Sequence, residues 1–345
     1  MRELLKTLSL AFGPSGCEDE VRDIIEEYVR ENMPENARIF KDKAGGLFLH
    51  VMGEGKKKLM VCAHMDEVGF MVTHIEDNGL LRFGCVGGID PIVLTAKRVV
   101  SESGRKGSII AKPVHLLSPS EREKRPKIEN MMIDIGADSR EEAQKVTFVG
   151  EYFTFDSDYV EYGDGFIKCK ALDDRLGCEI MCRVIKDLKE KKYQSEYDLY
   201  FAFTCREEVG FSGAHSATYI VNPDYAVVIE SKAVADVAGV SEQKKVCPLG
   251  DGAIVSFADL GTIYDRDFTS HVMDLCQKAD IKYQMHRIVS GGNDSRHIQT
   301  GAQGARVALL SAPSRYIHSP ADVVHGDDLD AIYKALTEII TKRGI

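Results

Sequence analysis

The stretch LYFAFTCREEVG (residues 199–210) begins as an apolar run and ends in two adjacent carboxylates. A short apolar run bounded by polar residues predicts a buried strand. Adjacent side chains of a strand point to opposite faces. Glu207 and Glu208 could simply be a solvated strand end. A pair needed only for solubility is more usual on a helix face or a loop tip, so we ask whether these two divide a chemical task.

Three other short apolar runs, at 59–63, 225–229 and 307–310, have the same character. They alternate with amphipathic segments at 18–31, at 173–188 and from about residue 327 onward. Continuous apolar strands between helices are typical of a sheet that is covered on both faces. The sequence therefore predicts an α/β fold with a mixed, largely parallel sheet flanked by helices.

Residues 70–163 have a different composition, rich in glycine and in turn signals such as EDNG and ESG. Short alternating segments such as KGSIIAKPV lie between the turns. This pattern predicts a small β-rich domain inserted into the α/β domain. The catalytic part would then comprise residues 1–69 and 164–345.

Composition excludes several classes of protein. The chain has 345 residues, 44% hydrophobic and 28% charged, with a net charge of −10, which argues against a nucleic-acid partner. No apolar run approaches the length of a membrane span, and the N-terminus does not resemble a signal peptide. Nine cysteines without a CxxC pair indicate reduced thiols rather than a thiolate zinc site. We therefore expect a cytoplasmic protein with no membrane and no nucleic-acid partner.

Residues that can bind a metal follow each predicted strand. They are His64 and Asp66, Glu207 and Glu208, Glu230, and His318, and a fifth segment places Asp173 and Asp174 at the start of a helix. In open α/β sheets, ligands bind outside the carboxyl ends of the strands. Each residue alone has a plainer explanation, such as a surface histidine or a helix cap. Their joint occurrence at successive strand ends favours a shared site.

The residue types narrow the chemistry of that site. Two imidazoles and several carboxylates without thiolate suit Zn²⁺, Co²⁺ or Mn²⁺. A carboxylate that bridges two such ions makes a two-metal hydrolase site. Two bound cations would also offset the repulsion among so many acids. The residues therefore predict a metal-dependent hydrolase.

The chain resembles the co-catalytic metallo-aminopeptidases, which include the tetrahedral (TET) aminopeptidases and the bacterial glutamyl aminopeptidases. The matching motifs are GPSGCEDEVR (13–22), AHMDEVGF (63–70), AKPVHL (111–116), KALDDRLG (170–177), TCREEVGFSGA (204–214), GGND (291–294) and RYIHSP (315–320). They occur in the family's order and cover nearly the whole chain. The resemblance implies a fold of the zinc-exopeptidase type.

The resemblance also implies a role for each polar residue. His64 and Glu230 would bind one metal ion, Glu208 and His318 the other, and Asp173 would bridge both. Zn²⁺ or Co²⁺ would be the ions. Asp66 would orient His64, and Asp174 would hold the peptide bond before it, which is cis in related enzymes. Glu207 would be the general base.

The implied reaction is removal of the N-terminal residue from short peptides by a metal-activated water. The implied role of the inserted domain is assembly, commonly of dimers into a hollow dodecamer. Lys232, Asn293, Asp294 and Arg296 are candidate substrate-pocket residues, and Lys232 and Arg296 depart from the family's usual small residues. Either cation could pair with an acidic N-terminal side chain.

Two alternatives remain open at this point. One is a metal-independent glycosidase of endoglucanase type, because carboxylate pairs also cleave sugars. Such an enzyme would not require His64 or His318. The other is a non-catalytic peptide-binding assembly protein that keeps the scaffold, and retention of Glu207 with the full ligand set argues against it.

Overall fold

The main sheet has the predicted mixed, largely parallel arrangement. A computed structural model describes residues 2–53, 55–193, 195–241 and 243–342. Among these residues the sheet has the order β1-β2-β12-β3-β13-β16-β14-β15. The bounds are β1 (Ala37–Lys41), β2 (Leu47–Val51), β12 (Asp198–Thr204), β3 (Lys58–His64), β13 (Tyr225–Ala233), β16 (Arg306–Ser314), β14 (Ala253–Val255) and β15 (Tyr283–Met285). The predicted α/β fold class is confirmed.

The four middle strands are parallel and contain the four apolar runs. β12 pairs with β3 up to Thr204 opposite His64, and β13 pairs with β3 on its other side. β16 in turn pairs in parallel with β13. The side chains of these strands are almost wholly buried. Parallel pairing brings their carboxyl ends to one edge of the sheet.

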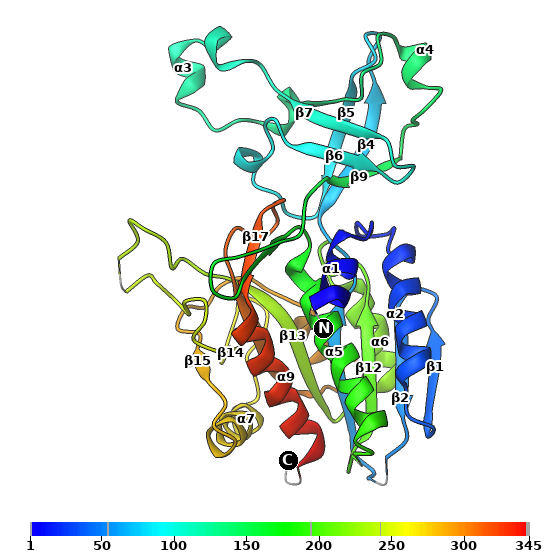
Figure 1. The fold of residues 1–345 in the computed structure, drawn as a ribbon, viewed down its shortest axis with the longest axis vertical. Coiled ribbons are helices and arrows are strands. Elements are labelled where there is room, and N and C mark those ends of the chain that lie inside the picture. Colours follow the sequence, from blue (N-terminus) through cyan, green and yellow to red (C-terminus); the bar gives the residue numbers. More distant parts are fainter. Residues whose placement is uncertain (1, 54, 194, 242, 343–345) are drawn as a thin grey trace.

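Helices cover both faces of this sheet, as Figure 1 shows. One face packs against α1 (Arg2–Leu10), α2 (Asp19–Asn32), α5 (Leu172–Glu190), α7 (Arg266–Lys278) and α9 (Gly326–Thr341). The other face packs against α6 (Ser212–Val221) and the short α8 (Ser295–Ile298). The predicted amphipathic segments correspond to α2, α5 and α9, whose apolar sides lie in the larger core.

The inserted β-rich segment forms a closed antiparallel barrel, the upper body in Figure 1. Its strands are β4 (Gly69–Ile75), β5 (Leu81–Val86), β6 (Arg98–Ser101), β7 (Lys106–Ile110), β8 (Met132–Asp134) and β9 (Tyr152–Phe155). Between them lie η1 (Pro91–Val93), η2 (Val114–Leu116), α3 (Pro119–Arg122), η3 (Ile128–Asn130) and α4 (Arg140–Ala143). Phe70 packs edge-on against Phe83 and Phe155 in the barrel core.

The barrel has two features that the sequence did not indicate. Its edge strands pair with each other and so close it. The last barrel strand also ends at Phe155, before the expected boundary at residue 163. β10 (Val160–Tyr162) instead joins β11 (Phe166–Cys169) and β17 (Asp322–His325) in a separate three-stranded sheet. Sequence periodicity does not show which strands pair, so neither feature could be predicted from it.

Within the described ranges, we find no helix with the length and apolar character that crossing a membrane requires. The expected cytoplasmic location stays a prediction.

Candidate metal centre

The predicted ligands meet at the carboxyl edge of the parallel strands. His64 is the last residue of β3, and Glu230 lies in β13, which continues beyond it. Glu208 follows the end of β12, His318 follows the end of β16, and Asp173 stands in the first turn of α5. The structure therefore gathers side chains from five segments that are far apart in the sequence.

One group of ligand atoms surrounds the His64 ring. Its Nε2 atom lies 3.3 Å from Asp173 Oδ1 and 3.8 Å from Glu230 Oε2. All three residues are buried. Ligand atoms of His64, Asp174 and Glu230 lie within 4.8 Å of one another, and so do those of His64, Asp173 and Glu208. One imidazole and two carboxylates at that spacing could hold a divalent ion.

A second group surrounds the His318 ring. Its Nε2 atom lies 3.0 Å from Glu208 Oε1 and 3.2 Å from Asp173 Oδ2. Asp173 therefore directs one oxygen toward each imidazole, which is the arrangement that a bridging carboxylate requires. His318 is more open than His64, with 29% of its side chain exposed against 1%.

Unpartnered buried atoms provide a test of whether a metal fits this site. His64 Nε2, Asp173 Oδ1, Glu208 Oε1 and Glu230 Oε1 are all buried and make no hydrogen bond, although His64 Nε2 and Asp173 Oδ1 face each other at 3.3 Å and Glu208 Oε1 faces His318 at 3.0 Å. Buried polar atoms are nearly always satisfied, and each unsatisfied one requires an explanation. Four orphaned atoms on four predicted ligands are explained by cations that they would coordinate.

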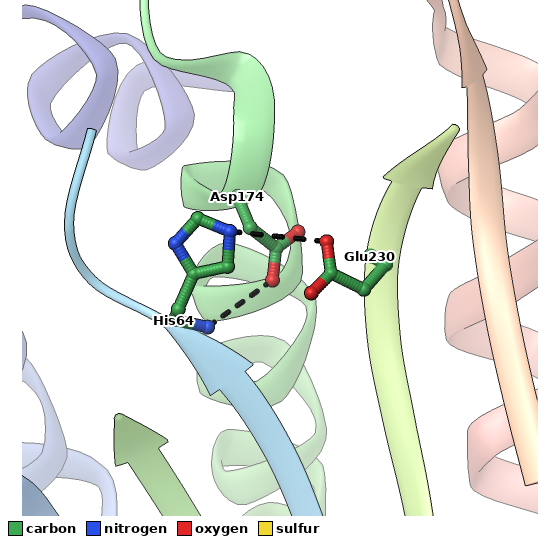
Figure 2. A group of neighbouring side chains, drawn as sticks. All are labelled: His64, Asp174 and Glu230. Carbon is green, nitrogen blue, oxygen red and sulfur yellow. Dashed lines mark hydrogen bonds and ion pairs between the residues drawn. The ribbon is translucent and has the colours of Figure 1, made fainter. Parts of the chain in front are cut away.

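Asp174 lies close to the same atoms, and Figure 2 shows it beside His64 and Glu230. Its Oδ2 atom accepts a hydrogen bond from the backbone N–H of His64 (3.3 Å), and its Oδ1 atom accepts one from Gly177 (3.2 Å). Both oxygens are therefore engaged, whereas Asp173 keeps a free one. The ligand role of Asp173 stays a prediction, and Asp174 is a second carboxylate near the same ring. The Asp173–Asp174 peptide bond is cis, as the resemblance implied.

The charges of the site are strongly coupled. Burial would lower the pKa of His318, but Asp173 and Glu208 outweigh it and raise that pKa to about 11. Burial would likewise lower the pKa of His64, yet Glu230 and Asp173 raise it well above its usual value. The negative charge of these carboxylates is therefore stabilised by nearby positive charge. Either protonated imidazoles or bound metal ions can provide that charge. Metal binding would release those protons and weaken at low pH.

Glu207 stands beside the ligands with a different environment. It is buried, and burial raises its pKa well above the usual value, opposed by His64 and reinforced by Glu208. A carboxylate with a raised pKa in a cleft is suited to accept and return a proton.

Asp66 connects the base, one ligand and the N-terminal segment. Its Oδ1 and Oδ2 atoms accept hydrogen bonds from the backbone N–H groups of Glu207 (3.0 Å) and Glu208 (3.2 Å). His64 Nδ1 lies 3.1 Å from the backbone carbonyl oxygen of Asp66, which can accept its proton, and 3.3 Å from Asp66 Oδ1. A carboxylate on that side of a ring favours an Nδ1 proton and leaves Nε2 free for a metal.

Two contributors to the site were missed by sequence reasoning. The Ser15 hydroxyl donates to Asp66 Oδ2 over 2.5 Å, and the Gly88 carbonyl oxygen lies 2.6 Å from His318 Nδ1. Ser15 lies within a motif that we had noted, but nothing in that motif indicated its contact. Gly88 acts through its backbone and comes from the barrel, so side-chain chemistry carries no signal for it.

The sequence was also compared with models of known protein families. The model of the M42 glutamyl aminopeptidase family matches residues 45–334. The chain belongs to this family of metallopeptidases.

Relatives of this M42 chain carry aminopeptidase names. A protein of Acetivibrio thermocellus with such a name is 35% identical, over 99% of this chain and 98% of its own length. The lysyl aminopeptidase of Pyrococcus furiosus is 29% identical, over 97% and 96%. The glutamyl aminopeptidase of Lactococcus lactis is 28% identical, over 98% and 95%. The names of these relatives therefore differ in the residue that is removed.

Solved structures similar to this M42 chain include a TET aminopeptidase from Thaumarchaeota archaeon SCGC AB-539-E09. It has a TM-score of 0.95 and 32% identity, covering 100% of this chain and 96% of the other. The TET1 peptidase of Pyrococcus horikoshii has a TM-score of 0.87 and 31% identity, with 99% of each chain covered. A Thermotoga maritima protein named endoglucanase has a TM-score of 0.80 and 33% identity, covering 97% and 96%.

The four candidate pocket residues of this M42 chain do not share one environment. Asn293 donates its amide to Asp259 and Tyr264 (3.0 Å each), and Asp294 accepts from Thr204 Oγ1 (2.6 Å). Both are buried and held by these hydrogen bonds, and their role in a substrate pocket stays a prediction. Burial raises the pKa of Asp294 to about 6.

The two candidate cations also differ from each other. Arg296 is exposed. Lys232 is buried, and burial lowers its pKa, opposed by the charges of Asp259 and Glu230. Lys232 is thus the candidate that the structure places beside the predicted ligands.

Proposed function

We propose that this protein is a metal-dependent aminopeptidase that uses two divalent ions, with Zn²⁺ or Co²⁺ favoured by the ligand set. The observation that carries the proposal is the set of four orphaned buried atoms on His64, Asp173, Glu208 and Glu230. Membership in the M42 family supports the hydrolytic part of it.

The two ions would be held by two overlapping sets of residues. His64, Asp173 and Glu230 would hold one ion, and Asp173, Glu208 and His318 would hold the other. When bound, such ions would lower the pKa of a water molecule and stabilise negative charge on a peptide oxygen. Asp66 would keep His64 Nε2 available for binding.

Glu207 would carry the proton. Its raised pKa lets it accept a proton from water and then donate that proton to the leaving amine. Its backbone is fixed by the hydrogen bond to Asp66, so the carboxylate is held in place before substrate arrives. The cluster of carboxylates also favours the positive charge of a free α-amine, which is consistent with cleavage at the N-terminus.

We also propose that the protein forms a homo-oligomer and that this oligomer is a dodecamer. The similar TET1 peptidase of Pyrococcus horikoshii assembles into a tetrahedron or an octahedral shell. In this chain the barrel bears exposed apolar side chains, among them Val114 (70% exposed) and Leu116 (59%) on η2. A second copy that covered them would remove this surface from water.

Activity and metal content measured together test the enzyme proposal. Chelated protein and protein reloaded with Zn²⁺ or Co²⁺ are assayed on aminoacyl p-nitroanilides and on the same compounds with a blocked α-amine. We expect about two ions per chain, activity only after reloading, and cleavage only of the free-amine compounds.

Three outcomes would overturn this proposal. One ion per chain at saturation would exclude the two-metal site. Equal metal retention after Asp173→Ala would exclude the bridging role. Activity of the chelated protein on a cellulose substrate would support the glycosidase alternative instead.

A further inference from the structure

Glu18 precedes α2, at the position where a polar side chain usually accepts hydrogen bonds from the first turn of the helix. Its carboxylate makes no such bond to α2, all of whose residues the structure describes. Only 6% of Glu18 is exposed. Capping of the helix therefore does not explain why a charged side chain is buried at this place.

The Glu18 carboxylate instead binds two backbone amides outside the helix. Its Oε1 atom accepts hydrogen bonds from the N–H of Gly16 at 2.7 Å and from the N–H of Arg206 at 3.2 Å. Arg206 lies 188 residues further along the chain and directly precedes Glu207. Glu18 thus joins the N-terminal segment to the turn that carries the proposed base.

Glu18 and Asp66 together hold three consecutive N–H groups of that turn. Asp66 accepts from the N–H of Glu207 (3.0 Å) and from that of Glu208 (3.2 Å), and Glu18 accepts from that of Arg206. The two acids come from different segments, one before α2 and the other after β3. Hydrogen bonds to an ionised carboxylate are stronger than those between neutral groups. The start of the turn is therefore fixed from two sides.

The backbone conformation of Arg206 shows why a contact is needed at this point. Its φ is +57°, in the left-handed region that residues with a side chain rarely adopt. Such a conformation persists where the surrounding structure holds it. The Arg206 side chain is exposed, so the anchored group is its amide. Without the Glu18 acceptor, we expect Arg206 to relax toward a more common conformation, which would turn the chain that leads into Glu207.

We infer that Glu18 is a positioning residue for the proposed general base, and that it holds Arg206 so that the Glu207 carboxylate is directed at the metal centre. The inference rests on the proposed aminopeptidase function. A general base must lie within hydrogen-bond reach of the water whose proton it takes. A displacement of about 1 Å can cost about 100-fold in rate. Glu18 acts through the backbone and is not one of the proposed ligands.

Steady-state kinetics and metal analysis of metal-reloaded variants test this role. Glu18→Ala should lower kcat by about 10–100-fold and leave KM within about threefold, because the base acts in the transition state. Its metal content should stay at about two ions per chain, because Asp66 still holds the Glu208 amide. Glu18→Gln should restore most of the lost kcat, since its amide oxygen can accept the same two hydrogen bonds.

Asp19 provides a matched control. It follows Glu18 directly, carries the same charge and lies in the first turn of α2. Its side chain is 76% exposed and pairs with Arg22. Asp19→Ala removes a negative charge from the same end of the helix and leaves the bond between Glu18 and Arg206 in place. Its kcat should therefore equal that of the wild type.

A double-mutant cycle shows whether Glu18 acts through Glu207. In the Glu207→Gln background the base is already absent, so adding Glu18→Ala should lower the residual kcat by less than about twofold. A residue that merely stabilised the fold would cause the same loss in both backgrounds.

Amide hydrogen exchange provides a measurement that does not depend on turnover. In metal-loaded protein, the peptide that covers residues 204–210 should exchange at least about tenfold faster in Glu18→Ala than in the wild type. Glu18→Gln and Asp19→Ala should keep the wild-type exchange rate in this peptide.

The two hypotheses fail in different ways. Unchanged exchange in Glu18→Ala would show that Glu18 does not hold the turn, which overturns the inference. A loss of kcat that is equally large in the Glu207→Gln background, or that Glu18→Gln does not relieve, also overturns it. Absence of cleavage by the wild type and every variant after metal reloading would overturn the proposed function instead, and the exchange measurement would still decide whether Glu18 holds the turn.

Discussion

At the scale of single residues, two neighbouring carboxylates have different partners. Glu208 faces His318 at 3.0 Å, whereas Glu207 has a raised pKa and is not within ion-pair distance of either histidine in the described part of the chain. Their backbone N–H groups both donate to Asp66. One anchored turn therefore presents the proposed ligand, Glu208, and the proposed base, Glu207, in fixed relation to each other.

The pair gives a direct mutational test. Glu207→Gln should retain both metal ions and lose about 10²–10⁴-fold in kcat, because an amide cannot accept the proton from water. Metal analysis and steady-state kinetics on the same preparation check this.

Glu208→Gln is the matched control for that test, because it changes the adjacent carboxylate by the same few atoms. It should reduce the metal content instead. If Glu207→Gln kept near-wild-type turnover, the base would have to be another residue.

Asp66 is expected to affect metal binding without touching the metal. Asp66→Asn should weaken metal affinity by about 10-fold, because the negative charge beside the His64 ring is lost while the backbone carbonyl of residue 66 still accepts from Nδ1. Titration with a competing chelator measures this change. Ser15→Ala removes one hydrogen bond to the same carboxylate and should have a smaller effect. Unchanged affinity in Asp66→Asn would show that His64 is oriented by other contacts.

The sequence identified side chains better than their surroundings. His64, Glu208, Glu230 and His318 were found because each follows an apolar run, and parallel strands bring such ends together. The pocket role of Asn293 stays a prediction: its amide faces inward and donates to Asp259 and Tyr264, and a polar residue in a loop can hold the loop, contact a ligand, or both. No pattern in the sequence distinguishes these roles.

At the scale of elements, α5 carries an acid that should make stability depend on pH. Burial raises the pKa of Glu179 to about 7 from 4.5, although the charge of Arg183 opposes the shift. Between these two values the unfolded chain loses the proton and the folded chain keeps it. The ionisation of Glu179 therefore lowers the free energy of unfolding as the pH rises from 4.5 to 7. Its destabilising effect is absent below pH 4.5 and complete above pH 7.

Glu179→Gln should remove that dependence. We expect the variant to exceed the wild type in stability by about 1–3 kcal/mol at pH 8, with the difference vanishing as the pH falls toward 4.5. Urea unfolding of both metal-free proteins at several pH values measures it. Arg183 retains Asp330 at 2.8 Å and the Tyr333 ring, so it keeps partners in the variant. A stability difference between variant and wild type that stayed constant across this pH range would contradict the raised pKa of Glu179.

Elements were predicted more reliably than their pairing. The four apolar runs became β3, β12, β13 and β16 because each is too short for a helix and is bounded by polar residues. The pairing of β10 with β11, and the closure of the barrel, depend on contacts between segments that are distant in sequence. Local patterns do not record such contacts.

At the scale of the whole molecule, Glu67 joins the barrel to the α/β part. Its Oε1 atom lies 2.6 Å from Lys170 Nζ and 3.5 Å from the Arg175 guanidinium, and its Oε2 atom accepts from Thr154 of β9 at 2.8 Å. All of these residues are buried. One carboxylate therefore compensates two cations beneath the metal centre.

Removing that single charge should be costly. Glu67→Gln keeps the shape but leaves Lys170 and Arg175 without an anion, which should destabilise the protein by about 3–5 kcal/mol. Thr154→Val removes only the hydrogen bond and should cost about 1 kcal/mol. The urea unfolding midpoints of the two variants show whether the charge of Glu67 or its hydrogen bond to Thr154 contributes more to stability. Equal losses of stability would show that the charge of Glu67 is not what stabilises the contact.

The arm that carries η2 and α3 projects from the barrel in Figure 1 and offers the apolar surface for assembly. Val114 and Leu116 are exposed in the single chain, and water contact with such side chains costs roughly 25 cal/mol per Å². Because the barrel is closed, side chains rather than free strand edges would make the contact.

Light scattering should therefore show a homo-oligomer for the wild type at micromolar concentration, and Val114→Asp with Leu116→Asp should shift it toward smaller species. Two charges placed in an apolar contact would be buried without partners, which opposes association. Met52 is another exposed apolar residue (53%) and lies just after β2 in the α/β part, so Met52→Asp should leave the mass unchanged. A wild-type monomer, or an unchanged mass in the double variant, would mean that the arm does not mediate assembly.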